Sequence, residues 1–169
     1  MNDLPPVLDV CCGPRMFWFD KADSRALYND IRSKSYICKD VSSKPGFRFV
    51  NITPQTQFDF RDLPFPPETF SHVVFDPPHL THCGKSSWLI KKYGKLGDNW
   101  KEDIREGFGE CFRVLKPGGT LVFKWNETEI RVSEILKLTA QSPLYGHKSG
   151  KHSKTHWIVF VKEEKKGSE

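Results

Sequence analysis

The chain has 169 residues, of which 37% are hydrophobic and 13% aromatic, and it carries a formal net charge of +5 at pH 7. This composition excludes a disordered or collagen-like chain, and the length predicts one globular domain. The basic excess favours an anionic partner, although a soluble protein that merely happens to be basic fits the charge equally well.

No apolar run approaches the roughly 20 residues of a membrane span, and the N-terminal residues lack the pattern of a signal peptide. We therefore expect a cytoplasmic protein with no membrane contact. The five cysteines form no Cys-x-x-Cys motif and are odd in number, which predicts reduced thiols. They are Cys11, Cys12, Cys38, Cys83 and Cys111.

The first quarter of the chain predicts short buried strands. Residues 7–10 form an apolar strand that ends in a loop over 11–15, and a brief segment of helical character follows at 16–21. A second strand is predicted over 25–30, where it ends in an acid. The stretch 33–56 is ambiguous, because a short helix within it and a strand near its end both fit.

The middle of the chain contains one further strand. Residues 63–67 are too rich in proline for a regular element, and an apolar strand follows at 72–76. Residues 80–99 are expected to form a long loop. From 100 to 115 the apolar residues recur on one face of a predicted helix. The glycines at 118 and 119 predict the end of that helix.

The remaining predicted elements are a strand over 120–125, a helix over 127–139, and strands over 144–147 and 156–161. This order predicts an α/β fold with a mostly parallel sheet and one antiparallel strand near the C-terminus. Ligands bind such sheets at the carboxyl ends of the strands. The acids near those ends are therefore candidate site residues: Asp9, Asp30, Asp59 and Asp76.

The segment Asp76-Pro77-Pro78-His79 follows an apolar strand and suits the binding of an amine. The Asp76 carboxylate and the Pro77 carbonyl can both accept hydrogen bonds from one planar NH2 group. The prolines fix φ and supply no competing N–H donors. His79 provides a flat ring that could stack on an aromatic substrate. Taken alone, the segment is equally compatible with a structural turn.

Several segments together resemble the class I S-adenosylmethionine-dependent methyltransferases, over nearly the whole chain. Residues 7–13 resemble the first motif of that family, and Asp30 lies 21 residues after Asp9, where the family has its ribose-binding acid. Residues 59–65 resemble the segment that packs on adenine, and residues 113–121 the turn into the fifth strand. The chain also resembles small methyltransferases often carried by phages.

The resemblance implies a Rossmann-like class I methyltransferase fold, with one methyltransferase domain over 1–162 and a flexible tail over 163–169. It implies S-adenosylmethionine as the cofactor. The residues that it assigns to cofactor binding are Asp9, Cys11, Cys12, Gly13, Asp30, Asp59, Phe60 and Asp76. It assigns catalysis to Asp76, Pro77, Pro78 and His79, because the matching family motif marks methyl transfer to adenine N6, cytosine N4 or guanine N2.

The sequence departs from the family pattern at three positions. Cys11 and Arg15 replace two motif glycines, and His79 replaces the usual Tyr, Phe or Trp. Arg15 could pair with the cofactor carboxylate or face solvent. The aromatic residues 17–19 could line the cofactor site or belong to the core. No metal is expected, since the spacing of His79, His82 and Cys83 fits no zinc pattern.

The acceptor that the resemblance implies is a base in DNA or RNA, held by a basic loop. This partner surface consists of Lys85, Lys91, Lys92 and Lys95, with Trp88 and Tyr93 for stacking, and the basic turn Lys148–Lys154. A merely solvated face is the alternative. The chain has no room for a recognition domain, which leaves a recognition partner protein open. A small-molecule or protein acceptor and a non-catalytic cofactor-binding subunit also stay open, whereas the absence of GxGxxG disfavours a nicotinamide enzyme.

Overall fold

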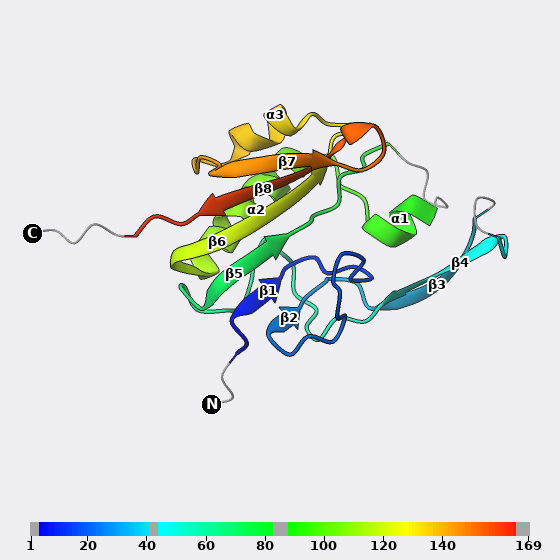
Figure 1. The fold of residues 1–169 in the computed structure, drawn as a ribbon, viewed down its shortest axis with the longest axis horizontal. Helices are drawn as coiled ribbons and strands as arrows, with labels where there is room; N and C mark the ends of the chain where they lie inside the picture. Colours follow the sequence, from blue (N-terminus) through cyan, green and yellow to red (C-terminus); the bar gives the residue numbers. More distant parts are fainter. Residues whose placement is uncertain (1–3, 41–43, 83–87, 165–169) are drawn as a thin grey trace, which may run out of the picture.

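The computed structural model describes residues 4–40, 44–82 and 88–164. Its centre is a six-stranded sheet in the order β2-β1-β5-β6-β8-β7 (Figure 1). The strands are β1 Val7–Asp9, β2 Ala26–Tyr28, β5 Phe70–Phe75, β6 Leu115–Asn126, β7 Tyr145–Ser149 and β8 Thr155–Val161. β2, β1, β5 and β6 are parallel, and β8 is antiparallel to both of its neighbours. The predicted mostly parallel sheet with one antiparallel strand is confirmed.

The other described elements are a two-stranded hairpin, three helices and two 3₁₀ turns. β3 and β4 pair as an antiparallel hairpin outside the main sheet. The bounds are β3 Lys34–Lys39, β4 Phe47–Ile52, α1 Trp88–Tyr93, α2 Trp100–Val114 and α3 Val132–Ile135, with 3₁₀ turns at Leu136–Leu138 and Lys151–Ser153. No helix in the described ranges has both the length and the apolar character needed to cross a membrane.

α2 covers one face of the sheet and creates the main core. Alternate residues of β6 point to this face, so Leu121, Phe123 and Trp125 are fully buried. They pack with the apolar stripe of α2, which the sequence predicted, including Ile104 and Phe108. In Figure 1 α2 lies behind the sheet, and the opposite sheet face is turned to the viewer.

A glycine in α2 allows this close packing. A Cβ atom at Gly107 would lie 2.7 Å from atoms of both the Phe60 and the Phe75 rings. Any larger residue would therefore push the helix away from these rings. Phe75 ends the strand that precedes Asp76, so this contact supports the region where the site is expected.

Two helical predictions are wrong or too long, for local reasons. Residues 16–21 form turns, because Arg15 has φ +53° and its side chain donates to the carbonyls of Lys21 and Thr53. The helix expected over 127–139 spans only 132–138. The Asn126 side chain accepts hydrogen bonds from the amide and hydroxyl of Thr128, which favours a turn there.

Two loop regions also differ from the sequence prediction. The ambiguous stretch 33–56 holds the β3–β4 hairpin and no helix within its described residues. The loop expected over 80–99 contains α1. Both elements lie beside the carboxyl ends of β1, β2 and β5 (Figure 1), so they shape the candidate site.

Candidate active site

A cavity of about 190 Å³ lies at the carboxyl ends of β1, β2 and β5. Its walls come from the loop after β1, the turn after β2, the segment after β5 and the end of α1. Of the residues assigned to cofactor binding, it brings together Cys11, Cys12, Gly13, Asp30, Phe60 and Asp76. Pro77 and Pro78 line the same cavity, so the segment after β5 faces the loop after β1.

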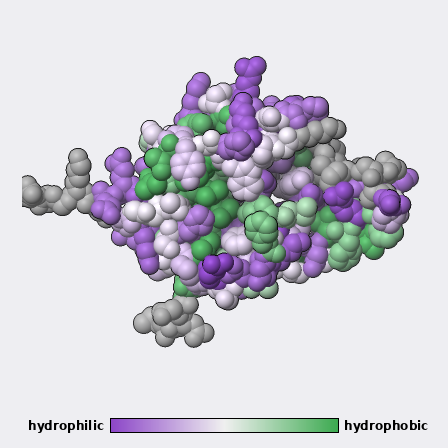
Figure 2. All heavy atoms as spheres, viewed as in Figure 1, coloured by the Kyte–Doolittle hydropathy of each residue, from purple (hydrophilic) through white to green (hydrophobic). Residues whose placement is uncertain are grey.

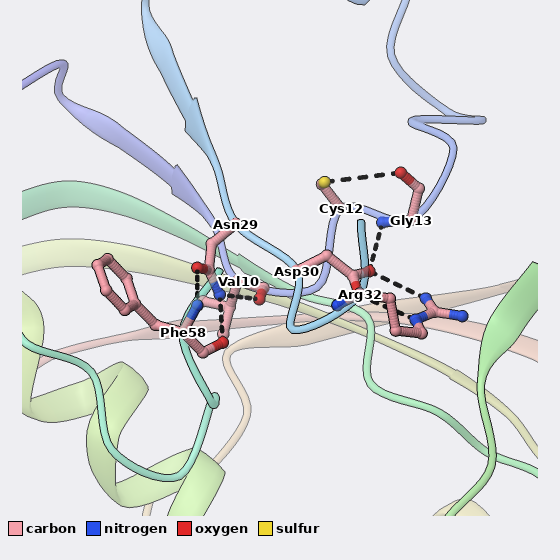
Figure 3. A network of polar contacts seen from close by, with 7 residues as sticks. All are labelled: Val10, Cys12, Gly13, Asn29, Asp30, Arg32 and Phe58. Atoms are coloured by element: carbon pink, nitrogen blue, oxygen red, sulfur yellow. Dashed lines mark hydrogen bonds and ion pairs between the residues drawn. The ribbon is translucent and has the colours of Figure 1, made fainter. Parts of the chain in front are cut away.

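The buried side chain of Asn29 joins two walls of this cavity (Figure 3). Its Nδ2 donates to the carbonyls of Val10 and Phe58 at 2.9 and 3.0 Å. Its Oδ1 accepts from the Phe58 amide and the Thr56 hydroxyl, each at 2.9 Å. This amide therefore fixes the loop after β1 to the segment that carries Phe58. Sequence reasoning missed Asn29, although its place next to Asp30 at a strand end was a usable signal.

Asp30 is held by three neighbouring groups (Figure 3). Oδ2 accepts from the Gly13 amide at 3.0 Å and from Arg32 Nη2 at 2.9 Å. Oδ1 accepts from the Arg32 amide and Nε, both at 2.9 Å. These four bonds use all the lone pairs of the carboxylate. Gly13 has φ +48°, a conformation that a glycine adopts without strain, and this lets its amide reach Asp30.

Asp9, which the resemblance assigned to cofactor binding, does not line the cavity. It is fully buried, and its Oδ2 accepts from Trp18 Nε1 at 2.7 Å. Burial raises the pKa of Asp9 to about 7, although the Trp18 hydrogen bond opposes the rise. Burial also raises the pKa of Cys12 to about 12, so this thiol is uncharged at neutral pH.

The aromatic residues 17–19 divide between three environments. Phe17 lines the cavity, as one of the sequence alternatives held. Trp18 packs edge-on against Tyr28 with ring centroids 5.0 Å apart, as the other alternative held. Phe19 is fully exposed. Arg15 is half-buried, and its guanidinium carbon lies 3.8 Å from the centre of the Tyr28 ring.

Asp59 is turned away from the cavity by an arginine two residues on. Its carboxylate pairs with Arg61 at 2.6 Å, and Arg61 also reaches Asp103 at 2.8 Å. The Arg61 hydrogen bond lowers the pKa of Asp59 below its usual value. Phe58 and Phe60 line the cavity instead. Phe60 therefore lies where it can contact a ring bound in the cavity, whereas Asp59 does not line the cavity.

Lys124 on β6 contacts the carboxylate of Asp76. Lys124 Nζ lies 2.6 Å from Asp76 Oδ2, and the two side chains are 19% and 16% exposed. Burial raises the pKa of Asp76 above its usual value, and Lys124 opposes that rise. Lys124 Nζ also lies 5.4 and 5.5 Å from the ring centres of Phe17 and Trp157. Sequence reasoning missed this lysine, although a charge inside an apolar strand is a signal.

A second cavity, of about 300 Å³, adjoins the first. The two share Asp76, Tyr93 and Lys124. His79 lines the second cavity, with its ring centroid 5.3 Å from that of Tyr93. Burial and the charge of Lys124 lower the pKa of His79 to about 4, so the ring is neutral at pH 7. The polar groups of this cavity also include Asn126, Thr128 and Thr155.

The predicted basic surface is only partly realised. Lys92 is 6% exposed and lines the first cavity, so it does not belong to an outer face. Lys91 lies with its ammonium 5.9 Å from the centre of the Tyr36 ring in the β3–β4 hairpin. Lys95 is exposed, and Lys85 lies outside the described residues. In the C-terminal turn Lys148, His152 and Lys154 are exposed.

No family model matches the chain, and no curated protein matches its sequence. Solved structures do match its fold. The PH0226 protein from Pyrococcus horikoshii is 18% identical with a TM-score of 0.55, covering 93% of this chain and 81% of that protein. A TehB-like SAM-dependent methyltransferase from Corynebacterium glutamicum is 12% identical, with a TM-score of 0.54 and coverage of 96% and 83%.

The N-methyltransferase NodS from Bradyrhizobium japonicum gives a similar result, with 13% identity, a TM-score of 0.54 and coverage of 95% and 86%. At these identities the likeness concerns the fold. The chain has the Rossmann-like fold of class I methyltransferases, which confirms the fold class predicted from the sequence.

Proposed function

We propose that the chain is an S-adenosylmethionine-dependent methyltransferase that acts on an exocyclic amino group of a nucleic-acid base, of the adenine N6 or cytosine N4 type. One observation carries the proposal. Two cavities meet at Asp76, and one of them lies at the strand ends where this fold class binds ligands. A donor and an acceptor molecule placed in the two cavities would therefore meet beside one carboxylate.

The residues of the first cavity fit the proposed cofactor. Phe58 and Phe60 offer apolar surface for an aromatic ring, and Asp30 offers carboxylate oxygens for hydroxyl groups. Arg32 fills three of the four acceptor positions of Asp30, and the Gly13 amide fills the fourth, so the guanidinium has to give up part of its pairing when hydroxyls bind. When bound, the cofactor supplies a methyl group on a positively charged sulfur.

Asp76 and Pro77 orient the acceptor amine in this mechanism. Lys124 holds Oδ2 of Asp76, and Oδ1 accepts no hydrogen bond within the described part of the chain. Oδ1 and the Pro77 carbonyl then accept the two amine hydrogens, which aims the nitrogen lone pair at the first cavity. With the cofactor bound, its methyl group would be transferred to this nitrogen with loss of the sulfide, and these two oxygens would stabilise the positive charge on nitrogen. The surplus proton then leaves to water.

His79 supports the acceptor ring. Its own ring is neutral at pH 7 and is placed between those of Tyr93 and Trp125, at centroid distances of 5.3 and 6.2 Å. A neutral ring in this position can stack on a base without adding a charge to the site. His79 therefore takes the role that an aromatic residue has in the family motif.

Mass spectrometry of nucleosides tests the proposal. The protein is incubated with S-adenosylmethionine bearing a trideuterated methyl group and with mixed DNA and RNA, which are then digested. We expect a deuterated methyl group on adenine N6 or cytosine N4. A labelled base with the methyl group on a ring carbon or ring nitrogen, or no labelled base while the protein binds the cofactor, would contradict it.

A small-molecule amine is the second candidate acceptor. The second cavity, with its neutral polar groups Asn126, Thr128 and Thr155, has the size for one free heterocycle. Free nucleosides and a metabolite extract, added to the same assay in place of nucleic acid, separate the two candidates. Label in the small-molecule fraction alone would favour this second function.

A further inference from the structure

The β3–β4 hairpin has two unlike faces. On the face toward the body of the protein, Cys38, Val50 and Ile52 are buried and form a small core of their own. On the other face, Ile37 stands directly opposite Phe49, and both are exposed, at 72% and 63%. Figure 2 shows this hydrophobic area at the end of the molecule that holds the hairpin, bordered by hydrophilic residues.

Two lysines lie beside the apolar residues of the exposed face, Lys39 on the face itself and Lys44 in the turn that joins the strands. Lys39 stands directly opposite Phe47, which is 53% exposed. Among the described residues from 32 to 53, five are basic, and the one acid, Asp40, is paired with Arg48 at 2.9 Å. The five basic residues are Arg32, Lys34, Lys39, Lys44 and Arg48. Arg32 pairs with Asp30, and Lys34 and Arg48 lie on the opposite face of the hairpin, so Lys39 and Lys44 supply the positive charge beside the exposed phenylalanines. A partner of this face is therefore anionic and also offers flat apolar surface.

The exposed face continues into the candidate active site. Phe49 lines a groove of about 390 Å³ together with Arg15 and Lys21. Gly13, Pro14 and Met16 form another wall of this groove, and the same three residues line the first cavity. A chain that lies along the hairpin and follows the groove thus reaches the mouth of that cavity.

We propose that the exposed face of the β3–β4 hairpin binds single-stranded nucleic acid. Phe47 and Phe49 stack on successive bases, while Lys39 and Lys44 contact phosphates. Every base has a π-face and every linkage a negative charge, so this pattern matches a single strand of any sequence. Two copies of the face would bring like charges together, which opposes self-association. The proposal deepens the proposed function, because it names how a polymeric acceptor is held.

Fluorescence anisotropy with a labelled single strand of about 16 nucleotides, DNA or RNA, tests this proposal. The double variant Phe47→Ala/Phe49→Ala should lose affinity about fivefold or more for each ring removed, the equivalent of roughly 1 kcal/mol per stacked base. Phe19→Ala is the matched control, since Phe19 is an exposed phenylalanine on the segment between β1 and β2. It should bind like the wild type.

The lysines give a second, independent measurement. Lys39→Gln/Lys44→Gln should lower the slope of log affinity against log salt by about 0.7 for each phosphate contact removed. An unchanged affinity of the phenylalanine variant overturns the proposal. The proposal is also overturned if sedimentation detects a dimer of the wild-type protein and the phenylalanine variant is a monomer. Cofactor binding and methyl transfer to free nucleosides are followed in parallel. If the wild-type protein binds the strand but methylates no base, only the proposed function is contradicted. If the protein methylates and the phenylalanine variant binds the strand with unaltered affinity, only the hairpin proposal is contradicted.

Discussion

Replacement of Lys124 by Met tests whether this lysine keeps Asp76 ionised. The Lys124 ammonium lies 2.6 Å from the Asp76 carboxylate, and both side chains are less than one-fifth exposed. Burial already raises the pKa of Asp76, and Lys124 opposes that rise. An opposite charge at this distance lowers the pKa of a carboxyl group by about 1–3 units. Its loss should raise the Asp76 pKa by that amount.

The predicted consequence is a shift in the pH profile of methyl transfer. Asp76 acts as an acceptor only when ionised, so activity is lost as the pH falls through the pKa of the folded protein. In Lys124→Met this acid limb should move up by about 1–3 pH units, with rates recovering as the pH is raised further. Lys116→Met is the control, because Lys116 is an exposed residue at the opposite end of β6. Superimposable profiles for Lys124→Met and the wild type would refute the reasoning.

Three further variants give separate tests. Asp9 has a folded-state pKa of about 7 against 3.8 unfolded, so the stability it contributes is complete below pH 4 and is lost as the pH rises through 7. In urea unfolding, Asp9→Asn should therefore gain up to roughly 4 kcal/mol over the wild type between pH 4 and pH 8; parallel pH curves would contradict this. His79→Phe should keep methyl transfer within about tenfold of wild type because it keeps a neutral ring, whereas His79→Ala should lose about fivefold or more. Equal loss in both would show that the ring is not what matters. Arg32→Met should bind S-adenosylhomocysteine roughly tenfold more tightly in calorimetry, since the two acceptor positions of Asp30 that the guanidinium holds become free; unchanged or weaker binding would count against a contact between Asp30 and the ligand.

The sheet and α2 were predictable because each has a one-sided apolar pattern. The strand before Asp76 ends in the apolar run Val73–Phe75, and the apolar residues of α2 recur on one stripe. The β3–β4 hairpin was ambiguous for a physical reason. Phe47 and Phe49 are apolar on its exposed face while Val50 and Ile52 are apolar on its buried face, so alternation gives no clear signal. α1 has only six residues, too few for a helical period to show.

The candidate site was predictable where backbone position alone decides it. Asp30, Asp76 and the loop after β1 line one cavity because parallel strands end at one edge of the sheet. The direction of a side chain depends on its neighbours, and the pairing of Asp59 with Arg61 was not foreseen from the sequence. Lys124 and Asn29 were missed because their partners are distant in sequence. Lys124 contacts Asp76, 48 residues away, and Asn29 contacts Val10, 19 residues away.

Asp76→Ala gives the most direct test of the central claim, that a carboxylate between the two cavities holds the acceptor amine. Single-turnover methyl transfer to a nucleic-acid acceptor and calorimetry with S-adenosylhomocysteine are measured on the same preparation. The account predicts that transfer falls by about 10²–10³-fold while the dissociation constant stays within about threefold. Transfer at the wild-type rate in Asp76→Ala would contradict it.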